Sequence, residues 1–199
     1  NTFMKLDCLG VACPLPVIRC KQYIKEFPGN PVEVLVDNEI ATQNLSKMAE
    51  QMGLQVSVQK HSDSNYSVHI EGNGKQLPQT QTVEYVPCDI DYVVVLAGDK
   101  MGEGDPVLGH KLLEGFVYSL TEQDVLPKYV LLYNGGVKLS TQNSKTIEDL
   151  KTLLGKGVSV LSCGLCLDFY GLKEQVQVGE ITNMYRILEI MRSHRVVRP

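Results

Sequence analysis

The sequence has no long run of basic residues and no apolar run long enough to cross a membrane. Its 199 residues carry 19 Lys and Arg against 23 Asp and Glu, whereas binding to nucleic-acid phosphates needs clustered positive charge. The longest apolar runs, such as YVVVLAG, have the length of a strand, so we expect neither a signal peptide nor a membrane span. We therefore predict a cytoplasmic protein whose main partner is not nucleic acid and which does not bind a membrane.

Known nucleotide and zinc patterns are also missing. The glycine-containing loops match neither a P-loop nor a dinucleotide fingerprint. Cys163 and Cys166 form a C-x-x-C segment, but a structural zinc site normally needs a second cysteine or histidine pair, and the chain has none of similar spacing. We expect no organic cofactor and no metal bound by one chain, and a zinc site shared between subunits remains an alternative.

Six cysteines are present. In a reducing compartment such residues are expected to be catalytic, metal-binding or packing residues, not a disulfide framework. Cys13 stands out because Pro14 follows it directly and Pro16 comes two residues later, and proline is tolerated in the first turn of a helix. The spacing predicts Cys13 as the N-cap of a helix, with Pro14 as its first residue.

A sulfur at a helix N-terminus is a candidate nucleophile. Free backbone N–H groups and the helix dipole there favour a thiolate over a thiol. The alternative is that Cys13 is a small apolar packing residue, and the two prolines favour the functional interpretation. Cys20 lies on the predicted apolar face of this helix and Cys8 ends a short strand, so we interpret both as packing residues.

The pattern of apolar residues predicts two α/β domains. Residues 4–72 read as strand, helix, strand, helix, strand, strand, a small two-layer α/β sandwich within a domain of residues 1–72. Residues 73–89 are polar, lack periodicity and contain two prolines, so we expect a linker. Residues 90–199 alternate fully apolar strands with helices, which predicts a three-layer α/β domain with a mostly parallel sheet. The last helix, over residues 181–194, is expected to bury Ile181, Met184, Tyr185, Leu188 and Met191 in the core.

The loops after the second domain's strands are its candidate site. Ligands of such folds bind at the carboxyl ends of the strands, where Cys163 and Cys166 follow the third strand. The C-x-x-C segment can be a redox pair, half of a metal site, or a nucleophile with a resolving partner. We expect the loops that follow the first two strands to join the cysteines, through Gly102, Asp105, Asn134, Gly135 and Gly136. Asp105 is predicted to cap the helix at Pro106, and His110 is either a base or a surface residue.

The segment DCLGVACPLPVI resembles the TusA/SirA family of sulfur-carrier proteins. The shared pattern is an acidic residue and a cysteine, a glycine, and Cys-Pro-x-Pro at a helix start, which here are Asp7, Gly10 and Cys13 to Pro16. The second domain resembles the DsrE-like family, and the order of the two domains is similar to that of YedF-type proteins associated with selenium metabolism. SCGLCLDFYGL and VGEITNMY carry this second resemblance.

The resemblance implies a chalcogen relay. Cys13 would carry a persulfide or a selenium adduct, and Cys163 or Cys166 would be the relay position of the second domain. Relay members often have one cysteine there and this chain has two, so the acting residue stays open. Donor and acceptor proteins with thiols are the implied partners, a homo-oligomer formed through the second domain is expected, and the protein would be a sulfurtransferase-like carrier.

Two other classes of function remain beside this one. The first is a thiol-disulfide redox protein that uses Cys163 and Cys166. The second is a regulatory or metal-binding module without catalysis. Persulfide transfer needs an accessible thiolate and no organic cofactor, and both proposed sites offer a thiol, so the relay is favoured.

Overall fold

A computed structural model describes residues 4–72 and 91–199. The chain divides into two compact units, residues 1–85 and 86–199, and each is described by itself. The predicted linker of residues 73–89 lies outside the described residues. Among the described residues no helix is long and apolar enough to cross a membrane.

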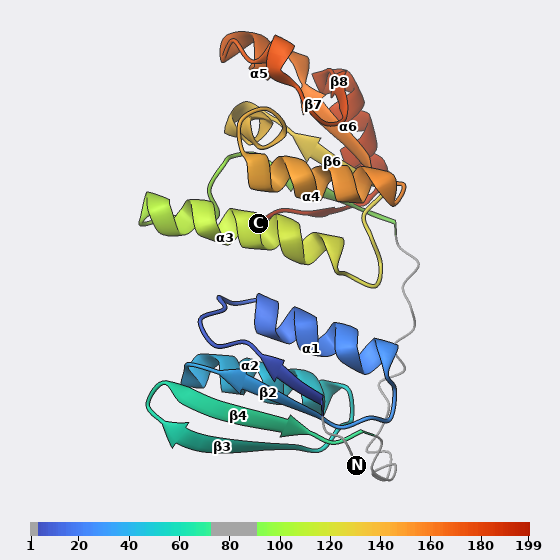
Figure 1. The fold of residues 1–199 in the computed structure, drawn as a ribbon. Coiled ribbons are helices and arrows are strands. Elements are labelled where there is room, and N and C mark those ends of the chain that lie inside the picture. Colours follow the sequence, from blue (N-terminus) through green and yellow to red (C-terminus); the bar gives the residue numbers. More distant parts are fainter. Residues whose placement is uncertain (1–3, 73–90) are drawn as a thin grey trace. The chain divides into compact units, whose positions relative to one another are not determined.

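The first unit is a four-stranded mixed sheet with two helices (Figure 1). Its elements are β1 (Met4–Asp7), α1 (Leu15–Glu26), β2 (Val32–Val36), α2 (Glu39–Gln51), β3 (Val56–Ser62) and β4 (Asn65–Ile70). The strand order is β1-β2-β4-β3, with β1 parallel to β2 and the other pairs antiparallel. The predicted βαβαββ order is thus confirmed.

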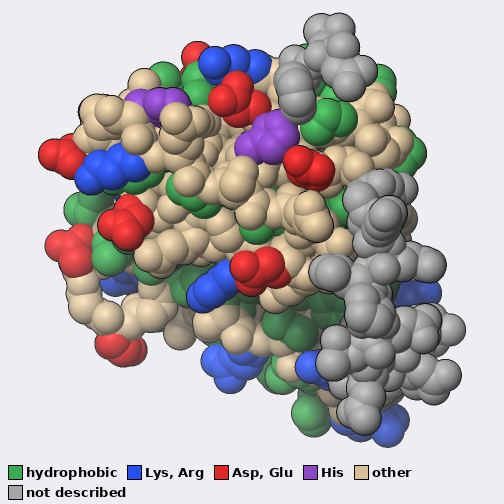
Figure 2. Space-filling view, turned by 90° about the horizontal axis from the view of Figure 1, so that it is seen from below, with side chains coloured by type: hydrophobic (Ala, Val, Ile, Leu, Met, Phe, Trp, Pro, Cys, Tyr) green, Lys and Arg blue, Asp and Glu red, His purple; other side chains and the backbone are tan. Residues whose placement is uncertain are grey.

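One face of this sheet is buried beneath the helices. Side chains alternate along β2, so that Val32, Val34 and Val36 are fully buried, as the period of two in a strand requires. They pack with Cys20 of α1 and Leu45 of α2 in one cluster. Figure 2 shows the outer surface from below. Acidic and basic side chains are interspersed on the surface seen there, without a large patch of one charge.

The second unit is a five-stranded sheet in which every pair is parallel. Its strands are β5 (Tyr92–Leu96), β6 (Tyr129–Leu132), β7 (Ser159–Cys163), β8 (Glu180–Thr182) and β9 (Arg195–Val197), in the order β8-β7-β6-β5-β9. Its helices are α3 (Pro106–Thr121), η1 (Asn134–Ser140), α4 (Ser144–Gly155), α5 (Gly164–Phe169), η2 (Lys173–Gln175) and α6 (Met184–Ser193). The parallel α/β class is confirmed. The strands β8 and β9 were not predicted, because each has only three residues.

Helices cover both faces of this sheet and make three layers (Figure 1). Side chains of α3, α4 and α5 join one buried cluster, with Leu113, Leu150 and Leu167 among them. The cluster on the other face receives Ile187 and Ile190 from α6. Three layers of this kind bury both sides of a parallel sheet, which is why the central strands β5 and β6 are made almost entirely of apolar residues.

The predicted core face of the last helix is wrong. Ile181 belongs to β8, and Met184, Tyr185 and Leu188 are 57, 80 and 60% exposed. Of the predicted set, Met191 is partly buried and packs against the core. The helix buries the neighbouring stripe of Ile187 and Ile190 instead. Both stripes of α6 are apolar, so hydrophobic periodicity alone could not tell which one faces the sheet.

Candidate functional site

Cys13 lies exposed at the end of the loop that joins β1 to α1. The helix begins at Leu15, one residue later than predicted, and Pro14 is its N-cap. The reason is that the carbonyl of Pro14 accepts the first helical hydrogen bond, from Ile18 N at 3.2 Å. Pro16 occupies the first turn and is buried, where its missing N–H costs no hydrogen bond. The thiol therefore stands just outside the helix start.

Two carboxylates shape the loop before Cys13. Asp7 Oδ1 accepts a hydrogen bond from Leu9 N at 3.0 Å, and Asp37 Oδ2 accepts one from Gly10 N at 3.0 Å. Gly10 has a φ of 71°, a conformation that L side chains rarely adopt. The sequence pattern pointed to Asp7 and Gly10 but missed Asp37, which is 27 residues further along the chain.

Hydrogen bonds hold Asp37 in its ionised form. The side-chain amide of Asn38 donates to Asp37 Oδ1 at 2.7 Å. This bond and the Gly10 N–H lower the pKa of the Asp37 carboxyl, because both donors favour the carboxylate. Asn38 also caps α2 through its side-chain oxygen, which accepts from Ala41 N at 2.9 Å.

The Cys13 thiol borders a shallow hollow between the starts of α1 and α2. Its lining includes Pro14 and Val17 from one side and Ile40 and Asn44 from the other. Asn44 Nδ2 lies 3.9 Å from Cys13 Sγ and points a donor at the sulfur. Ile40 is 67% exposed and provides an apolar edge. Asn44 could not be linked to Cys13 from the sequence, because 31 residues separate the two.

The other two cysteines of the first unit are packing residues, as predicted. Cys8 and Cys20 are fully buried in the cluster under the helices. Burial raises the pKa of Cys8 and raises the pKa of Cys20 to about 12, because a thiolate loses its hydration in apolar surroundings. Neither thiol is available for chemistry at neutral pH.

In the second unit the loops after β5 and β6 lie against each other at the carboxyl edge of the sheet. An added Cβ on Gly136 would collide with the carbonyl oxygen of Leu96, whereas one on Gly135 would have Gly98 Cα at 3.6 Å as its nearest neighbour. Gly136 is buried. The close approach of the two backbones therefore requires glycine at 136.

Cys163 and Cys166 lie beside this edge with different exposure. Cys163 ends β7 and is 2% exposed, whereas Cys166, in α5, is partly exposed. The backbone N–H of Asn134 donates to Cys166 Sγ at 3.1 Å. Burial and a hydrogen bond with Cys163 raise the pKa of Cys166, and the Asn134 N–H opposes them. The structure thus joins Asn134 to the cysteine pair, as the loop pattern predicts.

Side chains that the sequence analysis missed surround Asn134. Tyr170 Oη donates to Asn134 Oδ1 at 2.7 Å, and the Lys138 ammonium lies 5.1 Å from the centre of the Tyr170 ring. Lys138 Nζ also lies 3.9 Å from Asp99 Oδ2. Asn134 has a φ of 48°, so this network holds a residue in a backbone conformation that is uncommon outside glycine.

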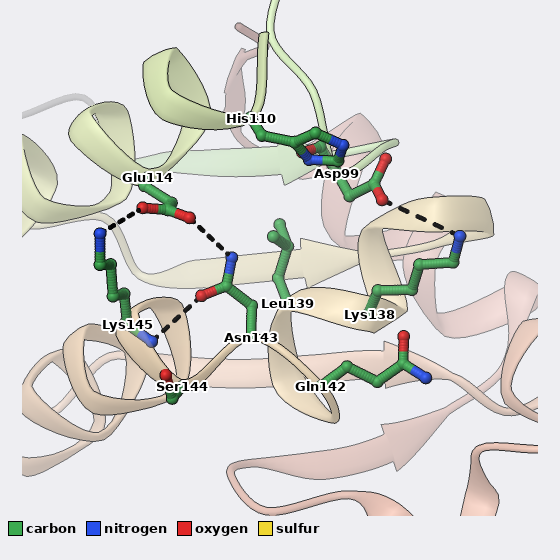
Figure 3. A pocket seen from close by; sticks show the side chains of 9 residues that line it. All are labelled: Asp99, His110, Glu114, Lys138, Leu139, Gln142, Asn143, Ser144 and Lys145. Atoms are coloured by element: carbon green, nitrogen blue, oxygen red, sulfur yellow. Dashed lines mark hydrogen bonds and ion pairs between the residues drawn. The ribbon is translucent and has the colours of Figure 1, made fainter. Parts of the chain in front are cut away.

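The remaining loop residues line two neighbouring cavities instead. Gly102 and Asp105 border one of about 240 Å³, and Asp105 caps α3 by accepting from Leu108 N at 2.9 Å, as predicted. His110 borders another, of about 320 Å³, together with Asp99 and Lys138 (Figure 3). The Asp99 carbonyl accepts from His110 Nδ1 at 2.8 Å. Cys163 and Cys166 do not line either cavity.

Metal ligation finds no support in the parts of the chain that the structure describes. No group of three or more His, Cys, Asp or Glu residues gathers there. The sites described above combine thiols with backbone N–H groups, amides, carboxylates, a histidine and a lysine.

Comparison with known proteins places the first unit in a family. Residues 4–72 match the family described as "Sulfurtransferase TusA". A relative from Methanocaldococcus jannaschii named "Putative sulfur carrier protein MJ0990" is 32% identical over 68 residues, which are 34% of this chain and 91% of that protein.

Two solved structures are similar to parts of this chain. A SirA-like protein from Desulfitobacterium hafniense is 43% identical, with a TM-score of 0.34, over 36% of this chain and all of that one. A protein of unknown function from Methanobacterium thermoautotrophicum is 21% identical, with a TM-score of 0.42, over 56% of this chain and all of that one. By its first unit, which carries the exposed Cys13 before the proline-fixed helix, the chain belongs to the TusA sulfurtransferase family.

Proposed function

We propose that the chain is a carrier that holds sulfur, or selenium, as an adduct on Cys13 and passes it to the thiol of another protein or domain. The observation that carries this proposal is the exposed Cys13 thiol between the starts of α1 and α2. The similarity of residues 4–72 to a protein named as a sulfur carrier supports it. Donor and acceptor partners would both present a reactive thiol.

The chemistry requires an accessible sulfur and no cofactor. An acceptor thiolate attacks the outer sulfur of the Cys13 persulfide, the S–S bond breaks, and its electron pair stays on Cys13 as a thiolate. The acceptor leaves as a persulfide, so nothing is oxidised or reduced overall. The Asn44 amide, 3.9 Å from Cys13 Sγ, can stabilise the charge that returns to this sulfur. The chain acts as a carrier and not as the enzyme that first mobilises the chalcogen.

Mass spectrometry tests this carrier role. The full chain is incubated with a small persulfide donor, or with selenide and an oxidant, and its intact mass is measured. We expect one added chalcogen on Cys13, loss of this adduct in Cys13→Ser, and its retention in the matched Cys20→Ser variant, whose cysteine is buried. Release of the adduct to a free thiol completes the test. An unloaded Cys13, or a Cys13→Ser chain that loads its first unit as well as the wild type does, would refute the proposal.

For the second unit we propose a DsrE-like domain that receives the chalcogen. Its all-parallel sheet and the thiols at the end of β7 support this assignment. The hypothesis is that Cys13 passes its cargo to the Cys163 and Cys166 pair. To test the transfer, Cys13 is loaded with labelled persulfide and the label is followed by peptide mapping. The transfer is excluded if two results are found together. The label never reaches the segment of residues 163–166 in the wild type, and a Cys163→Ser/Cys166→Ser chain discharges to outside thiols at the wild-type rate.

We also propose that the second unit forms a homo-oligomer. Its α5, β8 and α6 carry large apolar side chains that are between 45 and 83% exposed: Leu165, Phe169, Ile181, Met184, Tyr185 and Leu188. Exposed apolar groups in such number are typical of a protein interface. Light scattering at micromolar concentration tests this, with Tyr185→Ser/Leu188→Ser expected to lower the mass of the particle. A wild-type monomer would contradict it.

A further inference from the structure

The two cysteines of the second unit that the structure describes, Cys163 and Cys166, are not equivalent. Cys163 is enclosed in the cluster between the sheet and α6, whereas Cys166 is partly exposed and receives the Asn134 N–H at 3.1 Å. Cys163 ends β7 and is the N-cap of α5, Cys166 lies three residues further along, and Cys166 packs against the cluster that contains Cys163. An outside reagent can therefore reach Cys166 first, and the neighbouring thiol for an adduct on Cys166 is that of Cys163.

We propose that Cys166 is the receiving thiol and Cys163 its resolving partner, so that the second unit releases sulfur as hydrogen sulfide. This inference deepens the proposed function. It rests on that function only for the delivery of the sulfur. The pair would convert a bound sulfur atom into a free product, a step that the lone Cys13 cannot perform by itself.

The step balances in atoms and electrons. In the Cys166 persulfide, Cys163 attacks the inner sulfur, which is Cys166 Sγ. A bond forms between Cys163 Sγ and Cys166 Sγ, the bond to the outer sulfur breaks, and the outer sulfur departs with the electron pair and the proton of Cys163 as hydrogen sulfide. The outer sulfur is reduced and the two cysteines are oxidised to a disulfide. A dithiol reductant then restores both thiols.

The surroundings fit these roles. The Asn134 N–H donates to Cys166 Sγ and so stabilises negative charge on the atom that attacks an incoming persulfide. Tyr170 holds the Asn134 side chain at 2.7 Å and thereby helps to position this donor. Cys163, at 2% exposure, is shielded from outside thiols, so its reaction is restricted to its neighbour. Residues three apart on a helical turn lie side by side, as this exchange requires.

The test uses the full chain with Cys13→Ser in every protein, so that its outcome does not depend on the carrier thiol. Each protein is reduced, loaded with inorganic polysulfide and freed of excess reagent. Released sulfide is then measured. Mass spectrometry gives the mass of the tryptic peptide of residues 157–173, which contains both cysteines. We expect about one sulfide per chain, with a peptide that has lost two hydrogen atoms to a disulfide.

Variants separate the two roles. Cys163→Ser and Cys163→Ala should keep one added sulfur on Cys166 and release sulfide at least about tenfold more slowly, whereas Cys166→Ser should not load this peptide. Cys20→Ser, which removes a buried cysteine of the other unit, should behave as the parent does. Thermal unfolding selects whichever Cys163 variant retains the parent's fold.

Two results would overturn the inference. One is sulfide release at the parent's rate from the folded Cys163 variant. The other is loading of Cys163 in Cys166→Ser to the same extent as Cys166 in the folded Cys163 variant. Either leaves the proposed carrier role intact, because that role is judged by the loading of Cys13 in chains that retain it.

Discussion

In the first unit, among the described residues, the exposed thiol belongs to a single cysteine, whereas in the second unit a partly exposed cysteine packs beside a buried one. Cys13 has Asn44 beside it, whereas Cys8 and Cys20 are buried in the core of the same unit. Cys166 packs against the buried cluster that contains Cys163. A lone thiol can hold an adduct until another molecule removes it, whereas a paired thiol can discharge its adduct internally. The difference suits the first unit to carrying and the second to exchange.

The largest expected effect is a contrast in alkylation rate. Near neutral pH, iodoacetamide should modify Cys13 on the order of 100-fold faster than Cys8 or Cys20, because those two are fully buried and reaction requires an accessible thiolate. Burial raises the pKa of Cys166, so its rate should still be rising above pH 9. A time course with peptide mapping measures all of these rates. Faster modification of Cys8 or Cys20 in the native chain would break the comparison.

Substitutions at two adjacent glycines test whether the close approach of the two loop backbones maintains the second site. Gly136→Ala should destabilise the second unit by roughly 2 to 3 kcal/mol, because the new methyl group meets the Leu96 carbonyl oxygen. Gly135→Ala is the matched control, since its Cβ meets only ordinary contacts. Urea unfolding gives the stability, and alkylation of Cys166 shows whether Asn134 has moved. Equal effects of the two variants, or a change at Cys13, would contradict this expectation.

A smaller effect is expected at Asn44. Asn44→Asp replaces a donor that lies 3.9 Å from Cys13 Sγ with a negative charge, which should slow alkylation of Cys13 at pH 7 about fivefold. Gln43→Glu makes the same change of charge at the adjacent, exposed position, which does not line the hollow. If both variants slow the reaction equally, the effect is long-range charge and Asn44 has no specific contact with the sulfur.

The smallest expected effect is a difference between the two units in how their stability depends on pH. Burial, with Glu148, Glu114 and Glu122 nearby, raises the pKa of Asp149 in α4 to about 6. The folded state then binds the proton more tightly than the unfolded state does, so the second unit should gain stability as the pH falls from 7 towards 4. Asp149→Asn should remove this gain and stabilise the unit at pH 7 by on the order of 1 kcal/mol, allowing for solvent screening.

The first unit should respond to acid in the opposite sense. The lowered pKa of Asp37 contributes stability above the carboxyl's unfolded pKa, and this is lost as the pH falls through the folded value. Asp37→Asn should remove that acid sensitivity. Thermal unfolding of each variant between pH 3 and 8 measures both responses, and parallel shifts of the two units would contradict the assignment.

Local patterns predicted much of the fold and named the cysteines of both candidate sites. The alternation in β2 and the three-to-four spacing of buried residues in α2 and α3 identify these elements, because each buries one regular stripe. Cys13 was found from the two prolines that follow it. The same reasoning chose the wrong face of α6, where two stripes are apolar and only packing against the sheet selects Ile187 and Ile190.

The sequence by itself determined most of the elements, the parallel class of the second sheet and the position of Cys13, because these follow from residue patterns among near neighbours in the chain. Tertiary structure decided what surrounds each thiol. Asp37 reaches Gly10 across 27 residues, Asn44 reaches Cys13 across 31, and Asn134 reaches Cys166 across 32. It also decided that Cys163 is enclosed while Cys166 is partly exposed, since burial depends on which helix covers which face of the sheet.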